Sequence, residues 1–225
     1  MQTRPLAIAL PQGTALDRGS AHRVLRNTYA LLAMTLLFSA AVAGAAVAFS
    51  LPSPGIILTL VAYFGLLFGI HKLKNRGAAV GLVFALTGFM GWTLGPLLTR
   101  TLALPAGGQA VMLALGATGA VFLALSAYAT TTKRDLSWLG GFLFAGMIVA
   151  MLAGLAAIFF QIPALALTVS AVVALLSAGL ILYETQQIVN GGETNYVLAT
   201  VSLFVSIFNL FTSLLQLFGF MSSDD

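Results

Sequence analysis

The chain has 225 residues, of which 60% are hydrophobic and 7% are charged, with a mean hydropathy of +1.02 and a formal net charge of +4. Soluble globular domains have about 45–50% apolar and 25% charged residues, so this composition excludes a soluble domain and indicates a protein of the lipid bilayer. The sequence contains no cysteine, which excludes disulfides and thiolate metal sites.

The long apolar runs lack the period-two alternation of membrane barrel strands, so we expect helices to cross the bilayer. Runs of about 20 apolar residues predict seven spans, and the short breaks between them predict antiparallel neighbours in one compact bundle. The predicted fold class is therefore an all-α membrane protein, with one domain over residues 28–220. The spans are expected at residues 28–49, 55–70, 78–98, 109–130, 138–160, 164–183 and 195–218.

Two tails flank the predicted domain. Residues 1–27 are too polar for a span, and their apolar segment "LAIAL" is too short for the core of a signal peptide. Polar and turn-forming residues with two prolines predict that this N-terminal tail has no regular structure. Residues 221–225 form a short acidic C-terminal tail.

The distribution of Lys and Arg predicts the orientation of the chain. With seven spans, nine of the ten basic residues fall on the side of the N-terminus, and only Arg100 falls on the other side. The positive-inside rule then predicts a cytosolic N-terminus and a C-terminus on the opposite side of the membrane. The nine residues are Arg4, Arg18, Arg23, Arg26, Lys72, Lys74, Arg76, Lys133 and Arg134.

Small residues recur inside four of the predicted spans. Small side chains let helix backbones approach closely in lipid, so we interpret them as packing positions rather than as a binding signature. They are Gly44 in the first span, Gly81, Ala85, Gly91 and Gly95 in the third, Gly116 and Gly119 in the fourth, and Gly140, Gly141, Gly146 and Gly154 in the fifth.

A polar stripe runs along the last span. Its members lie at spacings of 4, 3, 4 and 3 residues, which places them within an arc of about 80° on one helix face. A matching set with a spacing of seven lies on the sixth span, which is expected to continue past Glu184 until Gly191 and Gly192 stop it. The two sets are Ser202, Ser206, Asn209, Ser213 and Gln216 on the last span, and Ser170, Ser177 and Glu184 on the sixth.

Folding these two spans back on each other places the sets at matching depths. Glu184 then lies level with Ser202, Ser177 with Asn209, and Ser170 with Gln216. An ionisable group inside a span is costly and often marks an ion or proton pathway. The alternatives are that Glu184 reaches the cytosolic interface and that the serines bond carbonyls of their own helix. The candidate ion-pathway or pH-sensing residues are Glu184, Ser177, Ser202, Ser206, Asn209 and Ser213.

Three stretches resemble the Bax inhibitor-1, or transmembrane Bax inhibitor motif, family, and in particular its bacterial YccA-type branch. They are "TGFMGWTLGPLL", "TTTKRDLSWLGGFLF" and "LYETQQIVNGGETNYVLATVSLFVSIFNLFTSLLQLFG". The resemblance implies a seven-helix bundle in which the seventh helix is central and the other six surround it. Such a helix can carry a polar stripe without facing lipid.

The resemblance also implies two functions. Some family members are pH-dependent calcium leak channels with one carboxylate on the sixth helix and one on the seventh, which fall here on Glu184 and Ser206. Because a serine replaces the second carboxylate, this chain lacks the pair that would share a proton. YccA-type members are partners and regulators of the membrane protease FtsH, which implies a partner-binding role for the tail around Arg18, Arg23 and Arg26.

From these observations we predict a modulator of FtsH, with a calcium, other cation or proton leak through Glu184 as the alternative. The sequence has no intramembrane lysine for retinal, no base beside a membrane serine, no phosphate-binding loop and no zinc-ligand spacing. We therefore expect no enzymatic activity and no nucleic-acid partner. No cofactor is expected, calcium would be a transported ion, and Glu184 is the one residue considered for contact with it.

Overall fold

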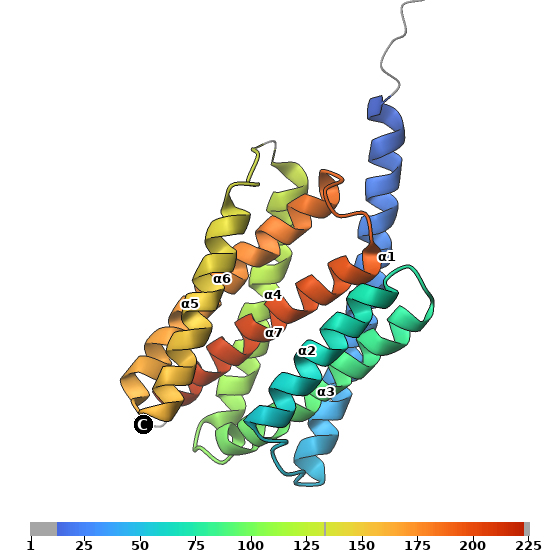
Figure 1. The fold of residues 1–225 in the computed structure, drawn as a ribbon. Helices are drawn as coiled ribbons and strands as arrows, with labels where there is room; N and C mark the ends of the chain where they lie inside the picture. Colours follow the sequence, from blue (N-terminus) through green and yellow to red (C-terminus); the bar gives the residue numbers. More distant parts are fainter. Residues whose placement is uncertain (1–12, 133, 223–225) are drawn as a thin grey trace, which may run out of the picture.

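The computed structural model describes residues 13–132 and 134–222, with side chains from residue 19 onward. These residues form seven α-helices and no strand (Figure 1). All seven helices are long and apolar enough to cross a membrane, which confirms the predicted all-α class and number of spans. The helices are α1 (Gly13–Ala48), α2 (Ile56–Leu73), α3 (Ala78–Leu102), α4 (Gly107–Thr131), α5 (Leu139–Phe159), α6 (Pro163–Val189) and α7 (Tyr196–Met221).

Helix α1 differs most from its predicted span, because it begins at Gly13 rather than near residue 28. A helix that is already formed in the membrane extends without a new nucleation step, so Ala, Leu and Arg residues before the span continue it. Its 36 residues measure about 54 Å, which exceeds the roughly 30 Å hydrocarbon core. In Figure 1 the N-terminal part of α1 extends beyond the other helices. Residues 1–12 and 223–225 of the two predicted tails lie outside the described residues.

A tight hairpin joins α6 to α7. Helix α6 continues past Glu184 to Val189, as predicted, and Gly191 follows with a φ of 76°. The Gly191 and Gly192 N–H groups donate to the carbonyls of Ile188 and Gln187 at 3.2 and 2.8 Å, a Schellman-type end. Helix α7 then starts at a side-chain cap, because Asn195 accepts hydrogen bonds from the N–H groups of residues 197 and 198.

Helix α7 is the most buried helix of the described chain. In its membrane-spanning window 61% of the residues are buried, against 44% or less in the other helices. It packs against α1, α3, α4 and α6, while α2 packs on α3 and α5 packs on α6. The largest fully buried side chain is Phe204, in the middle of α7. The polar stripe of the sequence therefore lies on the most buried of the described helices.

Glycines bring two helix pairs close together, as predicted. A Cβ at Gly91 of α3 would overlap the Ser39 carbonyl oxygen of α1, and one at Gly95 would lie 2.7 Å from the Ala46 Cβ. On α5, Gly140 and Gly146 face α6 in the same way, against Tyr183 and Leu176. The packing prediction is wrong for exposed positions at which a Cβ would meet no neighbour, because those helix faces are not covered by another described helix. These positions are Gly44, Gly81, Gly116, Gly119 and Gly141.

We expect the Gly91→Ala change to lower the free energy of unfolding by about 1–3 kcal/mol, because the added methyl group forces α1 and α3 apart. The Gly116→Ala change is the control, since its methyl group meets no neighbour and alanine favours helix by up to about 1 kcal/mol. Unfolding of purified protein in mixed micelles, followed by circular dichroism, measures both changes. Equal unfolding energies for the two variants would contradict the close approach of α1 and α3.

Candidate functional site

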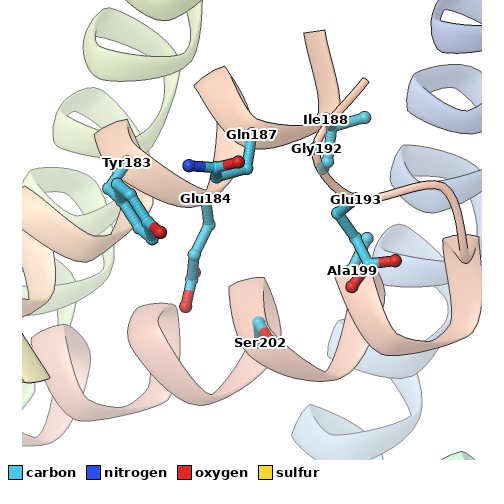
Figure 2. Close-up of a pocket in the computed structure, with 8 residues that line it drawn as sticks. All are labelled: Tyr183, Glu184, Gln187, Ile188, Gly192, Glu193, Ala199 and Ser202. Atoms are coloured by element: carbon cyan, nitrogen blue, oxygen red, sulfur yellow. The ribbon is translucent and has the colours of Figure 1, made fainter. Parts of the chain in front are cut away.

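A half-open pocket of about 230 Å³ lies where α6, the hairpin and α7 meet. Figure 2 shows the Glu184 carboxylate extending from α6 toward α7, with Ser202 on the α7 side and Glu193 on the hairpin. The pocket is therefore polar on three sides and lies at one end of the α6–α7 interface. Its lining residues are Tyr183, Glu184, Gln187, Ile188, Gly192, Glu193, Ala199 and Ser202.

The Glu184 carboxylate is held between the two helices. The Ser206 hydroxyl donates a hydrogen bond of 3.0 Å to Glu184 Oε2. Ser206 is buried, and Glu184 is partly buried at the wall of the pocket. The structure thus brings together the two positions that the family resemblance pairs. This contact differs from the alternative in which Glu184 turns away to the membrane surface.

A second polar contact links the two helices near their other end. The Ser170 hydroxyl lies 2.9 Å from Gln216 Oε1 on α7. It also lies 2.9 Å from the Ala166 carbonyl of its own helix, so both expected kinds of serine contact occur at this position. Glu184 with Ser206 and Ser170 with Gln216 fix the register of α6 against α7 at two depths.

The central pair of the predicted alignment does not form a hydrogen bond. Ser177 is fully buried, and its hydroxyl has no partner within the described residues. Asn209 is partly exposed, and its amide makes no hydrogen bond to the described chain. One edge of the polar stripe, with Ser206 and Ser213, is buried. The other edge is less buried: Ser202 and Gln216 are exposed and Asn209 is partly exposed, although Gln216 contacts Ser170 of α6 and Ser202 lines the pocket beside Glu184.

Sequence reasoning missed Glu193, a second carboxylate in the pocket. Glu193 Oε1 accepts a 2.7 Å hydrogen bond from the Asn195 N–H, so the same side chain also supports the hairpin. The sequence did hold a signal for this residue, because Glu193 directly follows Gly191 and Gly192. These glycines turn the chain back toward the last turns of α6, so the residue after them can reach the pocket beside Glu184. Within the described residues no group of three or more His, Cys, Asp or Glu side chains is arranged to hold a metal ion.

Gln186 attaches α6 to the loop between α4 and α5. Its buried side chain accepts a 2.9 Å hydrogen bond from the Leu136 N–H and donates to the Arg134 carbonyl. Both bonds satisfy backbone groups of the loop, and the other hydrogen bonds of its described residues are to the loop itself, the end of α4 or the start of α5. The last turns of α6 therefore contact α7 through Glu184 and the α4–α5 loop through Gln186.

We expect the Gln186→Leu change to release this loop, because two loop backbone groups lose their partners at a cost of about 2 kcal/mol. Limited trypsin digestion should then cut after Arg134 roughly 30-fold faster than in the wild type, if cleavage follows local opening. Gln187→Leu is the matched control, since the neighbouring Gln187 side chain faces the pocket instead. Equal cleavage of both variants would show that the loop does not depend on Gln186.

Comparison with known proteins places these features in a family. Residues 21–223 match the family model described as inhibitor of apoptosis-promoting Bax1. The chain is 52% identical over 206 residues to the "Modulator of FtsH protease YccA" of Escherichia coli K12, covering 91% of this chain and 93% of that protein. The same figures hold for the "Inner membrane protein YccA" of Escherichia coli O6:H1.

A third relative, the protein PA2604 of Pseudomonas aeruginosa, is 50% identical over 202 residues and is covered to 91% of its length. The matched region takes in all seven helices from residue 21 onward, including both halves of the Glu184 pocket. The chain is a multi-pass membrane protein of the Bax inhibitor-1 family.

Proposed function

We propose that this protein is an inner-membrane modulator of the FtsH protease. The observation that carries the proposal is the 52% identity to the Escherichia coli protein named for that role, which extends over nearly the full length of both chains. The name of the second relative supports the inner membrane as the location. A modulator acts by binding its protease, so this function requires a surface of the protein that is free to contact FtsH.

The protruding end of α1 supplies one such surface. Arg23 and Arg26 are exposed there, at the end of the bundle that also holds Lys72 in the last turn of α2 and Lys74 directly after that helix. The positive-inside rule makes this end cytosolic, with the end of α7 in the periplasm. The Arg18 side chain and residues 1–12 lie outside the described side chains, so Arg23 and Arg26 are the described residues of the tail on which a test can be built.

We expect the wild-type chain to co-purify with FtsH from solubilised inner membranes and to slow FtsH turnover of a membrane substrate. Reversing both charges, with Arg23→Glu and Arg26→Glu together, should weaken co-purification about three- to tenfold, because each exposed charge pair contributes up to about 1 kcal/mol. Arg100→Glu, at the opposite end of the bundle, is the control. Co-purification of the double variant at the wild-type level would remove α1 from the interaction.

A second candidate function is an ion leak through the Glu184 pocket. The observation that favours it is the half-open pocket in which Glu184 bonds Ser206 across the α6–α7 interface. A carboxylate at this place can bind a cation or proton that enters from the cytosolic end. The two functions are separable, because a leak is measured with the purified protein alone in liposomes.

A further inference from the structure

Four buried hydroxyl groups near one end of the bundle have no hydrogen-bond partner among the described residues. Elsewhere in the bundle threonine hydroxyls donate to carbonyls of their own helix, as Thr118 does to Ala114 at 2.6 Å. The four groups make no such bond, although three of their residues are at most 6% exposed. We call the four groups the hydroxyl layer. They belong to Thr28 and Tyr29 of α1, Ser126 of α4 and Thr185 of α6.

Ser126 and Thr185 lie at the same depth on neighbouring helices. Helices α4 and α6 contact each other and run in the same direction, because one span, α5, lies between them in the chain. The ends of α4 and α6 are level, since the buried Gln186 side chain bonds the backbone of the loop that follows α4. Both hydroxyls therefore lie about 6–8 Å from the ends of their helices.

Helix α1 brings its two hydroxyls to the same depth. The Thr200 hydroxyl, one turn after the start of α7, lies 3.3 Å from the Thr28 carbonyl oxygen. The Tyr29 ring packs on Phe122 of α4 at a centroid distance of 5.8 Å, and Ser126 lies one turn beyond Phe122. A helical tyrosine leans toward the N-terminus of its helix, which for Tyr29 is the direction of Ser126. Figure 1 shows the end of α6 between α4 and α1, and α6 contacts both helices.

The chemistry of the hydroxyl layer matches water. A hydroxyl that is buried without a partner is costly, and folded proteins pair such groups with other protein groups or with ordered water. Each hydroxyl donates and accepts, and a buried water makes about three hydrogen bonds of both kinds. A metal cation fits less well, because the Glu184 carboxylate, next to Thr185 in the chain, bonds Ser206 of α7 and leaves the layer without a negative charge.

We propose that the hydroxyl layer binds about one or two water molecules, which bridge α1 to α4 and α6. This inference stands without the proposed function. The site is separate from the Glu184 pocket, because none of the four residues lines that pocket. The bound water fastens the protruding helix α1, with its exposed Arg23 and Arg26, to the rest of the bundle.

Replacing single hydroxyls tests the proposal by the sign of the change in stability. Thr185→Val and Ser126→Ala each remove one hydrogen-bonding group without adding bulk. Each variant should raise the unfolding equilibrium constant about five- to tenfold, because the bound water loses a partner. A layer without water gives the opposite sign, since each variant then removes an unpaired polar group from the interior.

Unfolding of the purified protein in mixed micelles, followed by circular dichroism, measures these constants. Thr118→Val is the control, because its hydroxyl bonds its own helix, and we expect a change of less than about threefold. An unchanged or lower constant in either the Thr185 or the Ser126 variant would overturn the inference.

The double variant shows whether the two residues bind the same water. A shared water is lost in either single variant, so Thr185→Val combined with Ser126→Ala should unfold with nearly the constant of one single variant. Hydroxyls that bond separate groups, such as carbonyls of their own helices, multiply their effects to about 25- to 100-fold. A multiplied effect would therefore rule out the shared site.

Radiolytic labelling detects the water directly. X-rays generate hydroxyl radicals from bound water, and these radicals oxidise aromatic side chains beside it. We expect Tyr29 to be oxidised at least threefold faster in the wild type than in the double variant. Phe204, which is 1% exposed in the apolar core, is the reference and should stay unlabelled in both. Equal oxidation of Tyr29 in the two proteins contradicts the proposal, and a loss of wild-type stability when choline replaces sodium and potassium identifies a bound cation instead of water.

Discussion

The Phe204→Ala change is expected to lower the free energy of unfolding by about 2–3 kcal/mol. Phe204 is 1% exposed and lies in the middle of the most buried helix. Unfolded spans stay in lipid, so the water-to-core transfer of a soluble protein does not contribute. The loss of stability comes instead from the cavity that the ring leaves. A cavity of roughly 100 Å³ at about 24 cal/mol per Å³ gives the stated 2–3 kcal/mol.

The matched control is Phe68→Ala on α2, because Phe68 is 71% exposed and borders lipid. Lipid fills the space that this ring leaves, so we expect a change of less than about 1 kcal/mol. Unfolding in mixed micelles of detergent and lipid measures both variants on the same scale. A smaller effect at residue 204 than at residue 68 would contradict the burial of α7 between α1, α3, α4 and α6.

The sequence predicts the helices well because one physical quantity decides them. A run of apolar residues long enough for the bilayer defines each span, and the observed helices overlap all seven predicted spans. Helix ends follow the same logic where a turn signal is present, as at Gly191 after α6. The start of α1 differs, because no residue between Gly13 and the span stops a helix that continues out of the membrane.

The sequence predicted which residues of α6 and α7 share a helix face, but not which other helices cover that face. Spacings of three, four and seven residues place Glu184 and Ser206 on facing stripes. The short hairpin predicts Glu184 level with Ser202, whereas its hydrogen bond is to Ser206, one helical turn farther along α7. The pattern along one helix does not say which other helices cover it. The stripe is therefore partly exposed at Asn209 while Ser206 and Ser213 are buried, because α2 and α5 pack on α3 and α6 rather than on α7.

The Ser206→Asp change is expected to make ion flux through the protein at least tenfold higher at pH 8 than at pH 6. The new carboxylate takes the place of a hydroxyl that lies 3.0 Å from Glu184 Oε2. At low pH two such carboxyl groups share a proton and hold α6 against α7. At high pH both are ionised, and their repulsion at this distance separates the helices, since coupled carboxylates titrate in two well-separated steps.

Calcium and proton flux into dye-loaded liposomes measures this expectation with purified protein. Ser206→Asn is the matched control, because it has the size of the aspartate without its charge. Adding Glu184→Gln to Ser206→Asp should abolish the pH dependence, since one ionisable group then remains of the two. If the aspartate and asparagine variants pass ions equally at both pH values, the α6–α7 contact does not control a passage, and if the wild-type flux equals that of empty liposomes, the leak is lost as a function of this chain.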